Sequence, residues 1–464
     1  MACAWMGDSL GRKAAAEFLY NYIVKNDHIR VVNLNSPWGT GKTFFLDNWR
    51  RELEEKHICI SFNAWENDFS VEPLVSLVSE INSQLKKYSK TSESQEKLVS
   101  LIAKTGHAIK AASPVIAKGL LLKIAGISAD DVSESLKTGA DASEQALTYL
   151  IENQESAEKT IKDFKLALSE SIAKCRLENE EINGKAFFII DELDRCRPTY
   201  AIELLERVKH FFDIEDCVFI IASDTEQLSH AVRSVYGEGF DSTRYLKRFF
   251  DSEFSLDNSD LYGLVDIKTK PLRGAIRDLN LSLKPRGMYD LDPGLGRVAP
   301  PDKNTFIMSG SVSNEAAFVT VLSKKFNTSL REIDKNIKQI ISIRDNDPEG
   351  FDFIYASILV FMKDSTPDVY RQLVGGGVYV ANPDSVLGEL VEKNPINIIV
   401  EGERVSPIEL FLVYYNALSA TREELSRSVN SDRGLKSAIS YIVQAKKKYL
   451  EGLPKVVNLA SSLK

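Results

Sequence analysis

Short apolar runs alternate with amphipathic stretches over the first half of the chain. Runs rich in β-branched and aromatic side chains predict strands at residues 29–35, 57–63, 186–190 and 217–224. Apolar positions at helical spacing predict helices at residues 9–26, 42–56 and 71–86. Because these strands alternate with helices, the pattern predicts an α/β fold in which a mainly parallel sheet is flanked by helices.

The pattern changes outside this core, which we place at residues 1–256. Residues 87–184 are mostly polar and helix-prone, so we expect a helical insertion that packs on the core. Residues 257–310 hold glycine, proline and basic residues without clear periodicity, which predicts an irregular insertion. Helical spacing then returns, and we divide the remainder into a helical lid at 311–345 and a helical C-terminal domain at 346–464.

Composition narrows the class of protein. A net charge of −8 argues against a protein that coats nucleic acid electrostatically, although a local basic patch stays open. The five cysteines are scattered and form no C-x-x-C pair, which favours a reducing cytosol over a disulfide framework. The N-terminus lacks the basic and apolar regions of a signal peptide, so we expect a cytoplasmic protein.

The most membrane-like run of the chain is residues 111–128. Lys118 and Lys123 interrupt this run and Pro114 would kink it, whereas a spanning helix needs about 20 mostly apolar residues. We therefore expect a packed or surface helix here and no transmembrane span.

The stretch NLNSPWGTGKTFF, residues 33–45, lies between the first predicted strand and the following helix. It matches the phosphate-binding pattern G-x-x-x-x-G-K-[ST] except at the first glycine, where Ser36 stands. Two glycines let the backbone approach a phosphate, Lys42 supplies positive charge, and the hydroxyl of Thr43 can hold Mg²⁺. The candidate nucleotide-binding residues are Ser36, Pro37, Trp38, Gly39, Thr40, Gly41, Lys42, Thr43 and Phe44.

Ser36 is the one departure from this pattern. The first glycine usually eases a tight exit from the strand, where a left-handed backbone costs any other residue about 1 kcal/mol. Serine removes neither the lysine nor the backbone N–H donors, so we expect a geometric adjustment rather than loss of binding. A plain turn with two glycines is the simpler alternative.

A second motif supplies the carboxylates that such a site needs. Asp191 ends the strand at 186–190, where P-loop enzymes place the residue that holds the Mg²⁺ shell, and Glu192 next to it can polarise an attacking water. No N-K-x-D motif, which would recognise the guanine base of GTP, follows a later strand. ATP and Mg²⁺ are therefore the expected nucleotide and cofactor.

The motifs SPWGTGKT, FNAWE, IIDELDRC, FIIASD and YLKRFFDSEFSL together resemble the KAP family of P-loop NTPases. The resemblance covers roughly residues 8–256 and extends towards residue 345. It implies an additional-strand ATPase core of the ASCE group, related to the AAA+ and STAND proteins, with a helical insertion between the two nucleotide motifs. Many members carry membrane helices in that insertion. Here it is polar and interrupted by lysines, so the chain resembles a bacterial-type member without them.

The resemblance also implies roles for individual residues. Lys42 and Thr43 would bind the phosphates and Mg²⁺, Asp191 would complete the metal site, and Glu192 would be the catalytic base. Asp224 falls where such ATPases place a polar sensor at the end of a strand. A helix cap is the equally simple alternative for Asp224.

Four further residues are candidates at the edge of the site. Asn63 would orient Glu192 as a second sensor, or simply end its strand. Arg195, Arg248 and Arg331 are candidates for a catalytic contact to the γ-phosphate, where a positive group stabilises the transition state by several kcal/mol. Each arginine has the alternative of a surface ion pair.

These features lead to one main functional hypothesis and two alternatives. The main hypothesis is an ATP-hydrolysing switch in a homo-oligomer, with a separate effector protein encoded nearby, because the family includes phage-exclusion proteins found beside other antiviral defence components. The first alternative is a nucleotide-binding scaffold with little turnover, which Ser36 and the unassigned roles of the three arginines motivate.

The second alternative is a nucleic-acid-dependent ATPase. Six cations gather between residues 268 and 286 against the single acid Asp278: Lys268, Lys270, Arg273, Arg277, Lys284 and Arg286. The same stretch contains no aromatic side chain on which a base could stack, so a solvated loop is the simpler interpretation.

Overall fold

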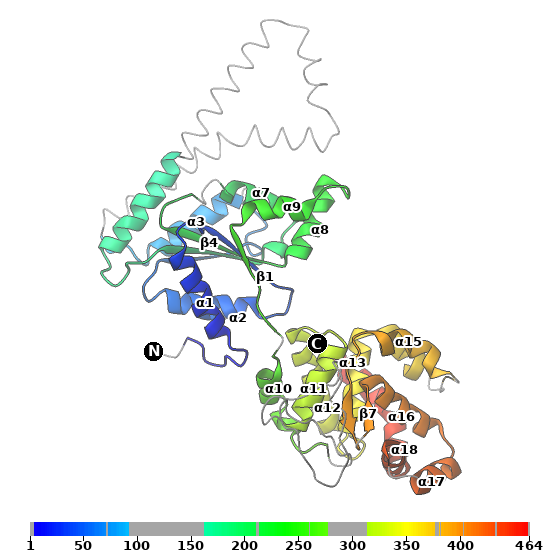
Figure 1. The fold of residues 1–464 in the computed structure, drawn as a ribbon. Coiled ribbons are helices and arrows are strands. Elements are labelled where there is room, and N and C mark those ends of the chain that lie inside the picture. The colour runs from blue at the N-terminus through cyan, green and yellow to red at the C-terminus, as the bar shows by residue number, and fades with distance from the viewer. Residues whose placement is uncertain are drawn as a thin grey trace, which may run out of the picture. The chain divides into compact units, whose positions relative to one another are not determined.

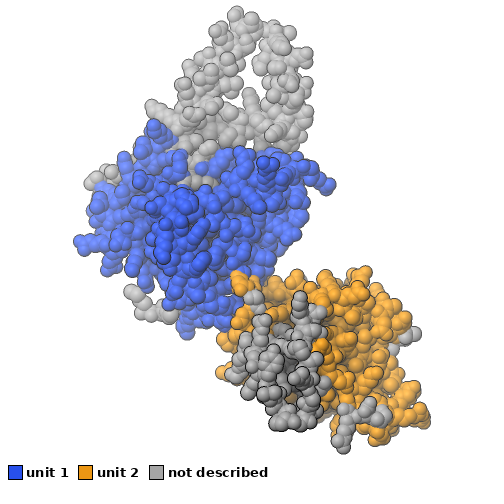
Figure 2. All heavy atoms as spheres, viewed as in Figure 1, with its two compact units in different colours: residues 1–256 blue, residues 257–464 orange. Residues whose placement is uncertain are grey.

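The computed structural model places the chain in two compact units (Figure 1). Unit 1 is Met1–Leu256 and unit 2 is Asp257–Lys464, drawn in different colours in Figure 2. The structure describes residues 4–70, 73–91, 162–209, 213–258, 260–276, 313–375, 380, 382–401, 403–431 and 434–462. The apolar run at 111–128 and most of the insertion expected at 87–184 lie outside these residues.

A five-stranded parallel sheet forms the centre of unit 1. Its strands are β1 (Val31–Asn35), β2 (Cys59–Asn63), β3 (Ala186–Asp191), β4 (Cys217–Ser223) and β5 (Ser252–Phe254). Their order is β2-β3-β4-β1-β5, and all of the pairs are parallel. The prediction of a mainly parallel sheet is confirmed, and β4 is the additional strand between β1 and β3. The short edge strand β5 was not predicted from the pattern.

Helices cover both faces of this sheet (Figure 1). The helices of unit 1 are α1 (Arg12–Lys25), α2 (Lys42–Leu53), α3 (Pro73–Leu85), α7 (Pro198–Val208), α8 (Thr225–Tyr236), α9 (Ser242–Leu246) and the 3₁₀ turns η1 (Leu193–Arg195) and η3 (Lys247–Phe249), with a further helix over residues 162–177. Phe187 and Ile189 of β3 pack against α1 and α2, whereas Phe188 and Ile190 pack with α3, α7 and α8. The alternation of side chains along one strand therefore builds two cores, as a central strand requires.

The first helix begins slightly later than its apolar spacing predicts. Gly11, with φ 66°, occupies the position before Arg12. The carboxylate of Asp8 accepts hydrogen bonds from the backbone N–H groups of Leu10, Arg12 and Lys13 at 3.2, 2.9 and 2.9 Å. Asp8 thus satisfies backbone donors at the start of this helix from three residues before Gly11.

Unit 2 is helical with one small hairpin. Its elements are α10 (Tyr262–Lys268), η4 (Lys270–Leu272), α11 (Asn314–Lys325), α12 (Leu330–Asn346), α13 (Phe353–Ser365), α14 (Pro367–Tyr370), η5 (Arg371–Gly375), α15 (Pro383–Glu392), β6 (Ile398–Val400), β7 (Glu403–Val405), α16 (Pro407–Ser419), α17 (Arg422–Ser431) and α18 (Leu435–Ala460). Every residue from Phe353 to Met362 is buried, so α13 is the central helix.

Two features of unit 2 differ from the expectation. Residues 262–268 belong to the stretch 257–310 that was expected to be irregular, yet they form α10; residues 277–312 lie outside the described part. The antiparallel hairpin of β6 and β7 was not predicted, because three-residue strands carry too little periodicity to detect. Among the described helices, none combines the length and the apolar character that crossing a bilayer requires.

Candidate nucleotide site

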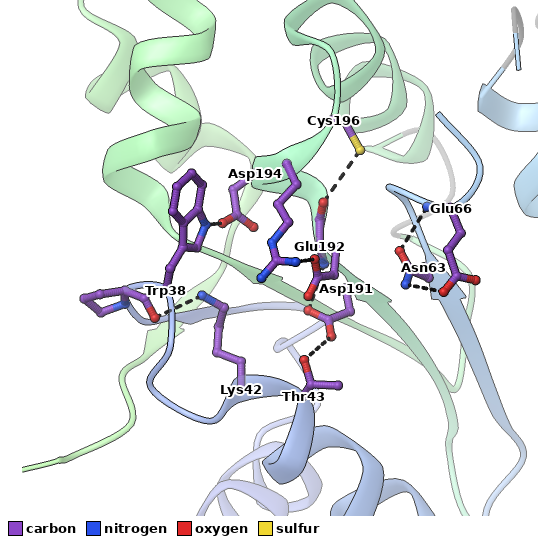
Figure 3. A network of polar contacts seen from close by, with 11 residues as sticks. Trp38, Lys42, Thr43, Asn63, Glu66, Asp191, Glu192, Asp194 and Cys196 are labelled. Atoms are coloured by element: carbon purple, nitrogen blue, oxygen red, sulfur yellow. Dashed lines mark hydrogen bonds and ion pairs between the residues drawn. The ribbon is translucent and has the colours of Figure 1, made fainter. Parts of the chain in front are cut away.

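The carboxyl ends of three parallel strands bring the predicted site together. β1 leads into the loop 36–41, β3 ends in Asp191, and β4 is followed by Asp224. Since parallel strands end at the same edge of a sheet, residues far apart in the chain meet there, which is the usual position of a ligand site in this fold class. Figure 3 shows Lys42, Thr43, Asp191 and Glu192 facing one another at this edge.

The loop between β1 and α2 has a left-handed backbone at both of its glycines. Gly39 has φ 76° and Gly41 has φ 88°, a region that other residues rarely adopt. Ser36 is not among the described residues with positive φ, so the expected backbone strain at this serine does not arise. The motif therefore tolerates serine at its first position without a left-handed conformation.

Lys42 lies against the carbonyl groups of its own loop. Its ammonium group donates to the carbonyl oxygen of Ser36 and, at 3.4 Å, to that of Pro37. Burial lowers the pKa of Lys42, and the nearby carboxylates of Asp194 and Asp224 oppose that shift. The lysine thus lies in a partly buried, acid-rich site, and within the described part of the chain its hydrogen bonds go to carbonyl oxygens of the loop.

Thr43 and Asp191 connect the loop helix with β3. The hydroxyl of Thr43 donates to Oδ2 of Asp191 at 3.2 Å, while Oδ1 accepts from the backbone N–H of Glu192 at 2.8 Å. Burial raises the pKa of Asp191, so a cation beside this carboxylate would relieve an electrostatic penalty. Hydroxyl and carboxylate oxygens are ligands that Mg²⁺ accepts in nucleotide sites, where water and phosphate oxygens supply the rest.

No cluster of three or more His, Cys, Asp or Glu side chains is arranged to hold a metal within the described residues. A cation between Thr43 and Asp191 would therefore depend on oxygens from outside the protein. This donor set fits a metal that arrives with a nucleotide rather than a permanent protein-only site.

Glu192 has a strained backbone and an arginine partner. Its φ and ψ are 62° and 24°, a left-handed conformation that costs a residue with a side chain about 1 kcal/mol or more. Its carboxylate pairs with Nη1 of Arg195 at 2.6 Å, and the guanidinium of Arg195 lies 5.6 Å from the ring centre of Trp65. Burial raises the pKa of Glu192, and the charge of Arg195 opposes this rise. Strain of this kind gathers at functional sites.

Two contacts that the sequence did not predict connect the loop with other elements of unit 1. The indole N–H of Trp38 donates to the carboxylate of Asp194, as Figure 3 shows. The buried Arg12 of α1 donates from Nη2 to the carbonyl oxygen of Thr40 at 3.0 Å. Asp194 lies within the motif IIDELDRC, which marked this part of the chain as a candidate site. Arg12 belongs to no motif and lies 28 residues before Thr40, so no sequence pattern predicted its contact with the loop.

The two sensor candidates have other contacts. Asp224 caps α8, accepting a hydrogen bond from the N–H of Gln227 at 3.3 Å, while its charge also acts on Lys42. Asn63 donates to Oε1 of Glu66 at 3.0 Å and accepts from the N–H of Glu66 at 3.2 Å. Asn63 thus closes the turn after β2, in agreement with the strand-ending alternative, and a sensor role for either residue stays a prediction.

Of the three candidate arginines, the structure brings Arg195 to the carboxylates. Arg248 lies exposed in η3, and among the contacts of the described residues none joins it to the site. Arg331 lies in the first turn of α12 in unit 2. Phe44, in the first turn of α2, is partly exposed beside the loop. The catalytic roles of the arginines stay predictions.

Comparison with known proteins gives one result. A family model described as the KAP family P-loop domain matches residues 12–345, which is well over half of the chain. A search of curated proteins returned no match. The matched range contains the loop 36–43 and both carboxylates, and it ends within α12. The parallel sheet, the glycine loop and the facing threonine and aspartate all agree with this match, so the chain belongs to the KAP family of P-loop NTPases.

Proposed function

We propose that this protein binds ATP with Mg²⁺ and hydrolyses it, so that the nucleotide acts as a molecular switch. One observation carries the proposal: Lys42, Thr43, Asp191 and Glu192 meet at one edge of the sheet, although they come from two distant parts of the chain. A cation, a hydroxyl and two carboxylates in this arrangement are the parts that phosphoryl transfer to water requires.

The loop and Lys42 would bind the phosphates. The N–H groups at the start of α2 and the helix dipole favour an anion there, and the two glycines let the backbone approach it closely. Lys42 would exchange the carbonyl oxygens of Ser36 and Pro37 for phosphate oxygens. The exchange replaces neutral acceptors with negatively charged ones, so the ammonium group gains a direct Coulomb attraction to the phosphate.

Thr43 and Asp191 would hold the Mg²⁺ that accompanies the nucleotide. When bound, this ion supplies positive charge against the negative charge that develops on the phosphate oxygens. Glu192 would accept the proton of the attacking water, and for this it must be ionised. Arg195 favours that state because its positive charge opposes the rise in the pKa of Glu192.

Phosphate release by the purified full-length chain tests the proposal. We expect Glu192→Gln to lower kcat by about 10²- to 10⁴-fold, the usual contribution of a general base, with ATP affinity little changed. Glu17→Gln is the matched control, since Glu17 pairs with Lys13 at 3.6 Å on the surface of α1. Equal rates in wild type and Glu192→Gln would overturn the mechanism.

The ion pair between Glu192 and Arg195 favours a second candidate, a scaffold that holds ATP without turnover. A base engaged by a neighbouring arginine is not free to accept a proton until that contact opens. The two candidates separate in a steady-state assay with Lys42→Ala. Turnover that is present in wild type and lost in this variant excludes the scaffold.

The proposal extends to a homo-oligomer that works with a separate effector in antiviral defence. Its support is membership of the KAP family, whose bacterial members include phage-exclusion proteins. Light scattering with and without an ATP analogue would test the oligomer, and a neighbouring nuclease gene would support a defence role. A monomer under both conditions would reject the assembly.

The nucleic-acid-dependent alternative is weakened because two of its three described cations have acid partners. Lys268 pairs with Asp334, and Nη2 of Arg273 pairs with Asp266 at 2.5 Å. Arg277, Lys284 and Arg286 lie outside the described residues. An ATPase rate unchanged by DNA or RNA at low salt would dispose of this alternative.

A further inference from the structure

Ser36 is the meeting point of four parts of unit 1. Its N–H donates to the carbonyl oxygen of Ser223 at 3.1 Å, and its own carbonyl accepts from the ammonium of Lys42. Its hydroxyl donates to the carbonyl oxygen of Asn35 at 2.6 Å and accepts from the N–H of Leu256 at 2.9 Å. The residue is only 2% exposed, and each of its polar groups has a protein partner.

The bond to Leu256 continues the pairing of β1 with β5 beyond the two strands, with a side-chain hydroxyl in place of a backbone carbonyl. The backbone register runs Val32 with Ser252, Asn33 with Glu253, and Leu34 with Phe254. The same spacing two residues later brings Ser36 opposite Leu256, where the strands have ended and a side-chain hydroxyl accepts the N–H. A glycine at position 36 has no such acceptor, so this contact exists only because the chain departs from the usual motif.

Leu256 is also the last residue of unit 1. Its side chain is buried in the core shared by α1 and α2, and the next residue begins unit 2. A buried N–H without a partner costs about 1–3 kcal/mol, so the Ser36 hydroxyl helps to hold this point of the chain. Ser36 therefore bonds both Lys42, the proposed phosphate-binding lysine, and Leu256, the last residue of unit 1.

We infer that Ser36 transmits nucleotide occupancy from Lys42 to the chain segment at Leu256. The inference rests on the proposed nucleotide binding. When Lys42 turns to a phosphate, the carbonyl of Ser36 loses its donor and the Ser36 peptide is free to readjust. Because the hydroxyl of the same residue holds the N–H of Leu256, the readjustment changes the strength of that bond. In a loop with glycine at this position there is no hydroxyl to bond Leu256, so a change at Lys42 would not reach the N–H of Leu256 by this route.

Hydrogen exchange of the backbone amide of Leu256 measures this coupling in the full chain. In wild type we expect a non-hydrolysable ATP analogue with Mg²⁺ to change its exchange rate by about 2- to 10-fold, as altering one hydrogen bond implies. Ser36→Thr keeps the hydroxyl and should keep the response. With the analogue at a concentration that saturates each variant, Ser36→Ala should lose the response. Ser36→Gly, which restores the usual motif, should also lose it and serves if the alanine variant does not fold.

Ser223→Ala is the matched control. Ser223 is another buried serine at the end of a neighbouring strand, and its hydroxyl donates to Oδ1 of Asn33 at 3.1 Å rather than to Leu256. We expect this variant to keep the response at Leu256. A response that is equal in Ser36→Ala and wild type overturns the inference, because the coupling would then bypass the hydroxyl.

The same data separate this inference from the proposed function. Wild type that binds the analogue and hydrolyses ATP without any change at Leu256 rejects the coupling alone. Wild type that shows the change without releasing phosphate rejects hydrolysis alone. Failure of the analogue to bind rejects both.

Discussion

At the scale of single residues, the notable feature of the site is that each ionisable group is restrained by a neighbour. Glu192 is strained and paired with Arg195, and Lys42 is bonded to the carbonyls of its own loop. These contacts hold charged groups that burial would otherwise disfavour. A nucleotide bound as proposed would have to replace some of these bonds. Variants that lack one of the contacts should therefore differ from wild type in binding or turnover.

The pH dependence of turnover tests the contact between Arg195 and Glu192. As the proposed base, Glu192 can accept a proton only when it is deprotonated, so we expect kcat to fall as the pH drops through its pKa. Arg195 opposes the rise of that pKa, so Arg195→Ala should move the acid limb of the kcat profile to higher pH. The matched control is Arg197→Ala, because Arg197 pairs with Asp68. Profiles with coincident acid limbs would contradict the assigned role of Arg195.

At the scale of elements, α1 belongs to the nucleotide site although it carries none of the motifs. Its first residue, Arg12, is 2% exposed and donates to the carbonyl of Thr40 in the loop. A second contact joins the loop to η1, where the indole N–H of Trp38 donates to the carboxylate of Asp194. The loop is therefore clamped between the first helix and the turn after β3, and its geometry depends on both.

Replacing Arg12 tests this clamp. Arg12→Met keeps most of the side-chain volume but leaves the carbonyl of Thr40 without this donor. We expect unit 1 to lose about 1.5–3 kcal/mol of unfolding free energy, as for a hydrogen bond to a charged group, and ATP to bind more weakly. Urea unfolding and ATP titration measure the two effects.

Lys13→Met is the control for the Arg12 variant. Lys13 is exposed and pairs with Glu17 at 3.6 Å on the surface of α1, a contact that contributes about 0–1 kcal/mol. If both variants lose the same small amount of stability and bind ATP equally well, the clamp has no energetic role.

At the scale of the whole molecule, the range of the family match and the structural units do not coincide. The match runs from residue 12 to residue 345, whereas unit 1 ends at Leu256. Helix α12, which contains residue 345, packs against α13 and α18 of unit 2. The predicted lid at 311–345 thus shares contacts with later helices, and its action as a lid stays a prediction.

Truncation tests which boundary governs folding. A chain of residues 1–345 would expose one face of α12, formed by the buried residues Ile333, Ile337, Ile340 and Ile343. Burial of each such side chain stabilises a fold by about 1.5–3 kcal/mol, so we expect this chain to aggregate. Residues 1–256 should remain monodisperse in size-exclusion chromatography. A stable, monodisperse 1–345 chain would place the boundary at the end of the family match instead.

The sequence by itself determined most strands of the sheet and the choice of candidate site residues. The alternating apolar runs predicted β1 to β4 and the helices α1, α2 and α3, since burial leaves a local pattern along each element. The spacing of Lys42, Thr43, Asp191 and Glu192 was enough to predict a phosphate site, because those residues follow strand ends that a parallel sheet brings to one edge.

Only the tertiary structure decided how those parts are connected. The bond from Leu256 to Ser36 joins residues 220 positions apart, and that from Trp38 to Asp194 joins residues 156 apart. The edge strand β5 depends on pairing with β1 rather than on its own three residues. Local periodicity records which side of an element is buried, but it contains no record of which distant side chain lies opposite. In the sequence Ser36 is a departure from the phosphate-binding motif. In the fold its hydroxyl and carbonyl connect Leu256 with Lys42.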